Sequence, residues 1–259
     1  MPSIDLFVHI RRATRRSWRI GRFLTLCVLL TACTIPAEEH ATTRGPAEAD
    51  PALIDPATAM RPATGRYRID TERSDLRILV YRAGRLAHLG HNHVVEARDI
   101  RGEVLIAQTP QGSRVNVTLP VQGLVVDDPA ARTRSGPDFA DPIDPEGIAG
   151  TRKNMLGPDQ LAPERWPTIR IVGTVRDPTL SWPATDLTLE VAIRIRDTTR
   201  RMRIPIVMTA LPDGALRASG RFALHQTAFG MTPVTAMAGA LAVRDRIDLV
   251  FSLVATPEV

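Results

Sequence analysis

The sequence predicts an all-β fold, either a sandwich or a closed barrel. Short segments between residues 67 and 255 alternate apolar and polar side chains, the period of two that lets one face of a β-strand cover a core. Many short strands of this kind are typical of sandwiches and barrels. The clearest segment spans residues 187–196, in which the apolar residues that share one face are Leu187, Leu189, Val191, Ile193 and Ile195.

Residues 1–32 have the layout of a secretory signal peptide. Six arginines between positions 11 and 22 form a basic start, and residues 23–30 form an apolar stretch that is too short to span a bilayer as a mature helix. The segment ends in Leu-Thr-Ala-Cys at residues 30–33, which resembles the lipobox of bacterial lipoproteins. In that interpretation Cys33 carries the lipid anchor, and the alternative is a chance cysteine after an ordinary cleavage site.

The signal segment accounts for the positive charge of the chain. The sequence has a net charge of +5, and residues 1–32 contain six arginines and one acid, Asp5, which already give +5. The mature protein is therefore expected to be nearly neutral, and the charge does not indicate nucleic-acid binding. Because Cys27 lies within the signal and Cys33 is assigned to the lipid, no disulfide is expected in the mature chain. In bacterial lipoproteins, an Asp directly after the lipidated cysteine marks retention in the inner membrane. This chain has Thr34 at that position, which favours the outer membrane.

Residues 33–65 are predicted to form a tether. They are rich in Ala, Pro, Thr and Glu, with five prolines spaced through them. Such a segment stays extended and buries little apolar surface, so it can hold a folded body some tens of ångströms from a membrane. The folded body is predicted to span residues 66–257.

The elements of the body follow from the alternation and from the turn-forming residues. Strands are predicted at residues 67–70, 76–80, 94–96, 102–107, 114–126, 168–175, 187–196, 202–210, 217–225 and 247–255. Residues 127–150 are rich in Asp, Pro and Gly and are predicted to be an irregular excursion. A short helix is predicted at residues 148–156, with Gly157 as its stop. The Ala-rich residues 232–242 are expected to plug or gate a barrel mouth.

Three of the six histidines, His88, His91 and His93, lie within ten residues, 87–96, at a predicted turn between two strands. Neutral imidazoles at this spacing can bind Zn or Cu, because His91 and His93 share one face of a strand and the turn can bring His88 round to them. The sequence leaves two alternatives open. The histidines can instead shape the turn at a barrel rim, or contact the head group of a ligand.

His225 is a further candidate for ligand binding. It lies in the predicted strand 217–225 and faces away from Phe222 and Leu224. If its face is the lumen, it can hydrogen-bond a ligand head group, and otherwise it is a surface residue. The acids that begin at Asp127 and Asp128 lack the spacing of a calcium loop, so a solvated loop is expected there. No catalytic triad or cofactor loop is recognised, and the sequence indicates a binding protein rather than an enzyme.

The order of these segments resembles that of the YceI-like family of bacterial exported proteins, over roughly residues 67–255. The resemblance is carried by YRID at 67–70, Ser74, KNML at 153–156, WPTI at 166–169, LTL at 187–189, FALHQTAFGM at 222–231 and the closing strand at 245–255. It implies an antiparallel, lipocalin-like barrel of eight strands whose lumen, in some members, holds a long isoprenoid or other lipid chain. The acid-rich residues 127–150 and the histidine-rich turn depart from the family's simplest pattern.

A barrel of this kind agrees with the composition. A closed barrel has no free strand edge, and an aliphatic lumen accepts an alkyl chain without polar partners. The chain has only six Phe, three Trp and two Tyr, so the lining is expected to be aliphatic.

The sequence therefore predicts a periplasmic, membrane-anchored lipoprotein that binds an isoprenoid or other lipid and needs no cofactor. The alternative is a histidine-rich metal-binding or metal-dependent periplasmic protein, with Zn or Cu at His88, His91 and His93. A homodimer is left open.

Overall fold

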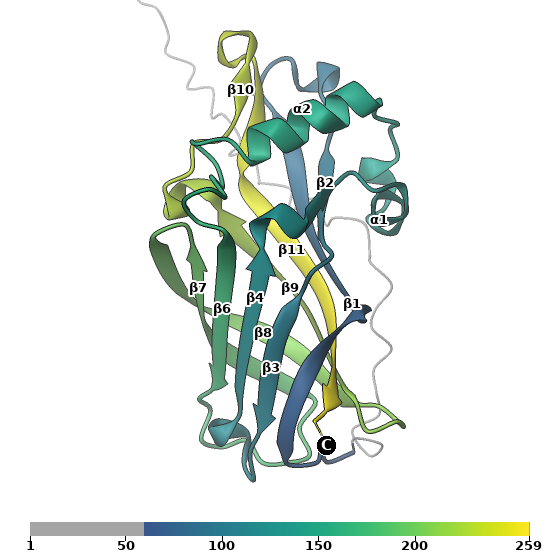
Figure 1. Cartoon of the computed structure of the whole chain (residues 1–259), viewed down its shortest axis with the longest axis vertical. Coiled ribbons are helices and arrows are strands. Elements are labelled where there is room, and N and C mark those ends of the chain that lie inside the picture. The colour runs from purple at the N-terminus through teal and green to yellow at the C-terminus, as the bar shows by residue number, and fades with distance from the viewer. Residues whose placement is uncertain (1–59, 259) are drawn as a thin grey trace, which may run out of the picture. The chain divides into compact units, whose positions relative to one another are not determined.

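The alternating segments form one antiparallel sheet that closes on itself (Figure 1). The computed structural model describes residues 60–258, so the predicted signal peptide, Cys33 and most of the tether lie outside the described residues. Eight strands form the ring, and the pairing of the last with the first completes it. In ring order they are β1 (Gly65–Ala83), β3 (Arg101–Ile106), β4 (Arg114–Pro120), β6 (Thr168–Val175), β7 (Asp186–Ile195), β8 (Thr198–Ala210), β9 (Leu216–His225) and β11 (Leu241–Pro257). The predicted all-β barrel of eight antiparallel strands is confirmed.

Strand β1 belongs to two parts of the molecule. It pairs with β11 along nearly its whole length, while its other edge pairs first with β3 and then with β2 (His93–Ala97). A bulge between Asp70 and Asp75 separates the two parts. There Ser74 Oγ donates to the carbonyl of Asp70 at 2.6 Å and accepts from the amide of Val254 at 3.0 Å. The bulge redirects the strand, so that its second half, still paired with β11, leaves β3 and carries β2 as the β1–β2 extension.

The predicted strand at residues 114–126 is two strands. β4 ends at Pro120, a 3-10 turn follows at Val121–Gly123, and β5 (Leu124–Val126) then pairs with β2 rather than continuing along the barrel wall. The short β10 (Thr235–Ala236) pairs with the start of β11 at the same end of the barrel. No helix within residues 60–258 is long and apolar enough to cross a membrane.

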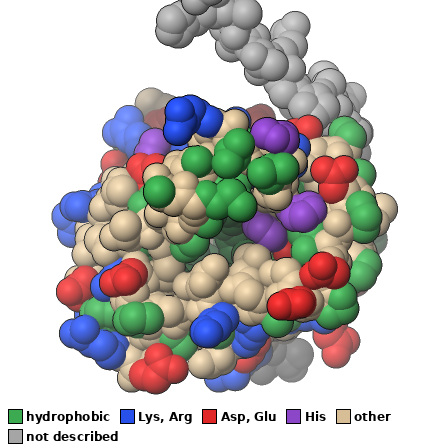
Figure 2. Space-filling view, turned by 90° about the horizontal axis from the view of Figure 1, so that it is seen from above, with side chains coloured by type: hydrophobic (Ala, Val, Ile, Leu, Met, Phe, Trp, Pro, Cys, Tyr) green, Lys and Arg blue, Asp and Glu red, His purple; other side chains and the backbone are tan. Residues whose placement is uncertain are grey.

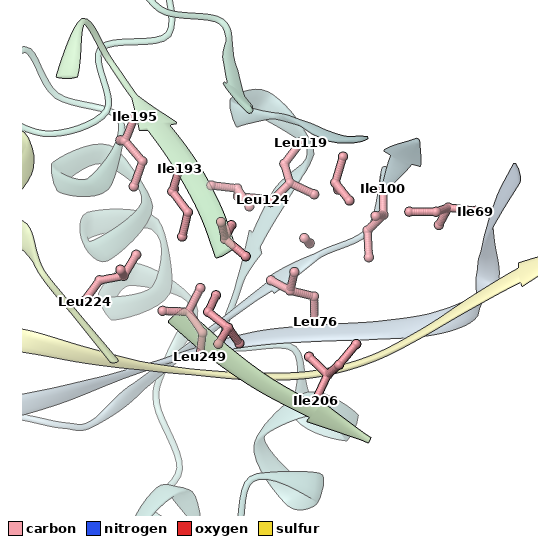
Figure 3. Close-up of a cluster of buried hydrophobic side chains, with 14 of the residues drawn as sticks. Ile69, Leu76, Ile100, Leu119, Leu124, Ile193, Ile195, Ile206, Leu224 and Leu249 are labelled. Carbon is pink, nitrogen blue, oxygen red and sulfur yellow. The ribbon is translucent and has the colours of Figure 1, made fainter. Parts of the chain in front are cut away.

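The core lies inside the ring. The period of two points one apolar face of each strand inward, and Figure 3 shows Ile193, Ile195, Leu224 and Leu249 from three strands converging there. In the most clearly predicted strand, Leu187, Val191, Ile193 and Ile195 are all buried. The strand alternation therefore produces an apolar lumen, as the sequence predicts.

Residues 127–150 are not the irregular excursion that their composition suggests. They form helix α1 (Pro129–Arg134), a 3-10 turn at Pro137–Phe139 and the start of helix α2 (Pro145–Met155). The helix predicted at residues 148–156 is α2, which begins earlier, at Pro145. Asp128 caps α1 by accepting from two backbone amides at 3.0 and 3.1 Å, and Asp144 caps α2 by accepting from Gly147 at 2.7 Å. The Asp-Pro pairs are thus helix starts, since Asp accepts at the N-cap and Pro fits the first helical position.

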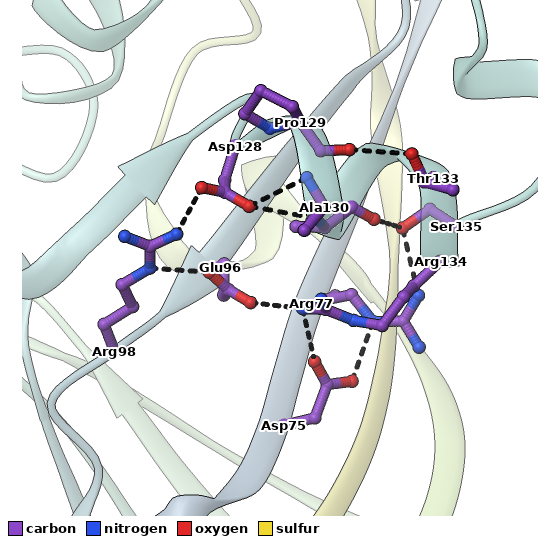
Figure 4. A network of polar contacts seen from close by, with 11 residues as sticks. Asp75, Arg77, Glu96, Arg98, Asp128, Pro129, Ala130, Thr133, Arg134 and Ser135 are labelled. Atoms are coloured by element: carbon purple, nitrogen blue, oxygen red, sulfur yellow. Dashed lines mark hydrogen bonds and ion pairs between the residues drawn. The ribbon is translucent and has the colours of Figure 1, made fainter.

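Helix α1 is fixed to the outer face of the β1–β2 extension. Phe139, which follows it, is buried together with Leu79, Val94 and Ala131, and its ring lies 5.6 Å from that of Tyr81. Beside this apolar cluster runs a network of ion pairs (Figure 4). Arg134 contacts Glu96 at 2.5 Å and Asp75 at 3.2 Å, and Arg98 contacts both Glu96 and Asp128.

Phe139→Ala is expected to lower the free energy of unfolding by about 3–5 kcal/mol, because it opens a cavity beneath the helical segment. Phe139→Leu keeps most of the buried volume and should cost less than about 1.5 kcal/mol. Urea unfolding followed by circular dichroism measures both. A loss below about 1 kcal/mol for the Ala variant would contradict the integration of this segment with the barrel.

Candidate functional site

Two cavities lie in series inside the barrel. The lower cavity, of about 130 Å³, is bounded by strands from most of the ring and by Trp182 from the loop before β7. The middle cavity, of about 110 Å³, lies above it and is bounded by residues such as Ile193, Leu224 and Leu249. Leu76 and Ile171 line both cavities, so these two side chains separate one from the other.

The lining of both cavities is almost entirely apolar. In the lower cavity the aromatic side chains are Trp182 and the edge-on pair Phe222 and Phe251, and most other lining residues are Val, Ile and Leu. The indole Nε1 of Trp182 donates to the carbonyl of Ala107 at 3.0 Å, which leaves the carbon face of the ring for the cavity. The largely aliphatic lining that the composition predicts is confirmed.

A third cavity, the mouth pocket, opens at the end of the barrel that carries α2. Its volume is about 260 Å³, and it shares with the middle cavity three apolar residues, Val80, Val95 and Met155, and two amides, Gln160 and Gln226. Figure 2 shows this end of the molecule hollowed, with histidine side chains gathered at one side of the hollow. Residues 234–236, part of the stretch expected to plug or gate a mouth, form one wall of the pocket.

His93 reaches the mouth pocket because it is the first residue of β2. The period of two places it on the same face as Val95, and both residues line the pocket. The ring Nδ1 lies 2.6 Å from Oδ2 of Asp127. An ionised carboxylate only accepts hydrogen bonds, so Nδ1 carries a proton and donates it. The opposite nitrogen, Nε2, lies 3.4 Å from the hydroxyl of Thr151 on α2.

Asp127 is held by three donors. Its side chain is fully buried, and Oδ1 accepts from the amide of Val94 at 2.9 Å and from Nη1 of Arg132 at 2.6 Å. Burial alone would raise the pKa of this carboxyl, but the hydrogen bonds from His93, Val94 and Arg132 outweigh it and lower the pKa below the usual value. The carboxylate therefore stays ionised, and the solvated loop expected at this residue is wrong.

Arg132 ties the same carboxylate to the surrounding loops. Its two terminal nitrogens donate to the carbonyls of Asn92 at 2.9 Å and Asp141 at 2.7 Å. The side chain of Asn92 in turn accepts from the amide of Arg82 and donates to the carbonyl of Asp138. The turn before β2 and the helical segment thus form one hydrogen-bonded unit, which fixes the orientation of the His93 ring.

The other two histidines of the turn do not join His93. His88 is exposed in a 3-10 turn at Ala87–Leu89, and His91 is exposed at the edge of the mouth pocket. Within residues 60–258, no group of three His, Cys, Asp or Glu side chains is close enough to hold a metal ion. The structure therefore does not bring the three imidazoles together at one point.

His225 lies on the outer face of the barrel. Its side chain is 62% exposed and its Nδ1 is 3.1 Å from Oδ2 of Asp245, whereas its neighbours Leu224 and Gln226 face inward and line the middle cavity. The sequence allows His225 to face either the lumen or the surface, and in the structure it faces the surface.

Sequence reasoning missed Asp127 and Thr151 as partners of His93. The sequence does contain one relevant pattern, an acid, Asp127, directly after an apolar strand. Only the pairing of β2 with β5 brings this acid next to His93, and that pairing cannot be read from the sequence.

Asp127→Asn is expected to lower the free energy of unfolding at pH 7 by about 3–5 kcal/mol, because it leaves Arg132 as a buried charge without its partner. Since the folded pKa is depressed, the carboxylate stabilises the fold fully above about pH 4, the usual pKa of an unfolded Asp, and this contribution is lost as the pH falls through the folded value. Urea unfolding at pH 7, 5 and 3 measures the free energy of unfolding of wild type and variant. The difference between the two free energies should be smaller at pH 3 than at pH 7.

Asp245→Asn is the matched control, since Asp245 also pairs with a histidine but lies at the outer surface. It is expected to cost about 1 kcal/mol or less at pH 7. Equal losses for the two variants would contradict the special role of the buried carboxylate.

Comparison with known proteins places the fold. The sequence matches no protein-family model and no curated protein. Among solved structures, BcnA from Burkholderia cenocepacia aligns with a TM-score of 0.51 and 13% identity, over 73% of this chain and 99% of BcnA. A polyisoprenoid binding domain from Saccharophagus degradans, implicated in plant cell wall breakdown, aligns with a TM-score of 0.50 and 9% identity, over 74% of this chain and 98% of that domain.

A YCEI protein from Campylobacter jejuni aligns with a TM-score of 0.43 and 9% identity, over 64% of this chain and 85% of the other. BcnA and the polyisoprenoid binding domain share only 13% and 9% of their residues with this chain, so the similarity shows a common fold and nothing beyond it. This chain therefore has the lipocalin-like barrel fold that its resemblance to the YceI-like family implies.

Proposed function

We propose that this protein binds the hydrocarbon chain of a lipid, an isoprenoid or another long chain, inside its barrel, and that it acts as a binding protein rather than an enzyme. The observation that carries the proposal is the series of cavities from the mouth pocket through the middle cavity to the lower cavity, joined by shared lining residues. The two inner cavities have apolar linings, so a hydrocarbon chain that occupies them is buried from water, which is worth about 0.8 kcal/mol per methylene.

The size of the cavities favours a slender ligand. Pockets for compact small molecules measure roughly 300–1,000 Å³. The two inner cavities have volumes of about 130 and 110 Å³, so each is smaller than such a pocket. A flexible chain can occupy them one after the other by passing Leu76 and Ile171. The Saccharophagus degradans neighbour, a polyisoprenoid binding domain, supports a ligand of this class.

We further propose that the protein is an outer-membrane lipoprotein on the periplasmic side. The supporting features are the signal-like residues 1–32, the cysteine at the end of the lipobox-like sequence and the Pro-rich tether. The tether would keep the barrel near the membrane, which is both the source and the destination of a lipid ligand.

Ile171→Trp is expected to abolish chain binding, because the indole would fill the passage between the inner cavities while the barrel still folds. The test is native mass spectrometry of the full-length protein, produced in a bacterial host and extracted from its envelope. Wild type should carry an added mass of several hundred daltons, of the order of one lipid chain, that organic extraction removes.

Val172→Trp is the control, since Val172 is the next residue of β6 and is exposed on the outside of the barrel. It should retain the added mass, and Ile171→Trp should lack it. Wild type without any extractable mass, or equal loading of the two variants, would contradict lumenal binding.

Cys33→Ser is expected to keep the protein out of the outer membrane, because a serine cannot accept the thioether-linked diacylglycerol and the signal segment is removed only after that step. Fractionation of cells that express each form would show wild type with the outer membrane and the variant, with its signal still attached, with the inner membrane. The tether and barrel are unchanged in the variant, so lipid binding by native mass spectrometry serves as the folding control. A folded variant that is processed and reaches the outer membrane like wild type would overturn the lipoprotein proposal.

A further inference from the structure

The mouth pocket differs in chemistry from the two cavities below it. On one side His93 lies beside Thr151 of α2, and Asn154 of the same helix also lines the pocket. The floor that continues into the middle cavity is formed by Val80, Val95 and Met155, together with the amide side chains of Gln160 and Gln226. His93 and Val95 are two residues apart on the same face of β2, a step of about 7 Å along a strand. A ligand whose chain enters the barrel over Val95 would therefore place its polar end beside His93.

We infer that the mouth pocket is a head-group site that selects a lipid with an uncharged hydroxyl, an alcohol or a phenol, and that Nε2 of His93 accepts the hydrogen bond from that hydroxyl. The inference rests on the proposed function, because the chain in the lumen is what brings the head group to the pocket.

The hydrogen bonds behind His93 determine which partner it takes. The proton on Nδ1 is directed to Oδ2 of Asp127 at 2.6 Å, so in the neutral ring the lone pair lies on Nε2 and points away from the carboxylate. The negative charge of Asp127 is already balanced by Arg132 at 2.6 Å, so a neutral ring leaves no unpaired charge. His93 therefore presents an acceptor to the pocket.

Within residues 60–258, this acceptor has no strong partner. The Thr151 hydroxyl lies 3.4 Å from Nε2, longer than the 2.7–3.2 Å of a well-formed hydrogen bond that involves nitrogen. A ligand hydroxyl between the two side chains can donate to Nε2 and accept from Thr151, which satisfies all three groups. An ether, an ester or a quinone carbonyl has no proton to donate and leaves Nε2 unpaired.

The same arrangement disfavours a phosphate head group. The oxygens of a phosphate dianion are acceptors, as is Nε2, and Asp127 lies directly behind the ring. Among the described residues that line the pocket, the cation is Arg82, and its Nη1 donates to the carbonyl of Gly90 at 2.5 Å, which holds the guanidinium against the turn. The site therefore matches a neutral donor better than an anion.

The inference is tested by comparing three ligands that share one chain: a prenyl alcohol, its methyl ether and its monophosphate. Their dissociation constants are measured with the full-length, delipidated protein at pH 8, by displacement of a fluorescent alkyl probe. The alcohol is expected to bind about 10-fold more tightly than either of the others, the discrimination of one good hydrogen bond.

Single substitutions distinguish the contribution of the acceptor, Nε2 of His93, from that of the other residues that line the pocket. His93→Leu should bring the alcohol and the ether to within about 2-fold of each other while the affinity for the ether persists. Thr151→Val removes one hydroxyl with little change of shape. Because the oxygens of the alcohol and of the ether can both accept from Thr151, this variant should weaken both ligands and keep the preference for the alcohol. If His93→Leu does not fold, the comparison of the three ligands on wild type still decides the inference. His88→Leu alters an exposed histidine of the same turn that does not line the pocket, and it should leave the preference unchanged.

The outcomes are distinct. Equal binding of alcohol and ether to wild type overturns the head-group site and leaves the lumenal chain intact, and tighter binding of the monophosphate likewise overturns it. Failure of all three ligands to displace the probe overturns the proposed function and this inference with it.

Discussion

The pairing of β1 with β11 is the interaction on which the rest of the structure depends. It runs from Tyr67 opposite Pro257 to Ala83 opposite Ala242, and it joins the first strand of the body to the last. Because it closes the ring, every strand of the wall has two neighbours and the backbone polar groups are satisfied within the sheet. The interior then needs no polar side chains to support the backbone, and a lumen with an apolar lining becomes possible.

The bulge in β1 explains why one end of the barrel differs from the other. On both sides of the bulge β1 pairs with β11, but below it the other neighbour is β3, and above it the other neighbour is β2, which carries β5 and lies beside the helical segment. The ring by itself would end in a simple rim. The extension adds a wall that carries His93 and, opposite it, α2 with Thr151. The polar mouth is thus a consequence of a local irregularity in a single strand.

The period of two in the sequence predicts the strands and the lumenal face, because both depend on neighbouring residues alone. It also predicts that His93 and Val95 share a face. The helical segment is harder to predict, since the same Asp and Pro residues serve as helix starts and as loop residues, and the burial of Phe139 depends on contacts with Tyr81 and Val94. The pair of His93 and Asp127 spans 34 residues and depends on the register of β2 with β5.

The position of the buried charges follows from the same requirement for an apolar lumen. A carboxylate inside the barrel would face side chains that offer no hydrogen bonds, at a cost of several kcal/mol. Asp127 instead follows β5 directly, where the amide of Val94 and the guanidinium of Arg132 are available as donors. Only the imidazole of His93, 17% exposed, extends from this cluster into the pocket. The protein can therefore present an oriented polar atom at the mouth while the two cavities below it remain suited to a hydrocarbon chain.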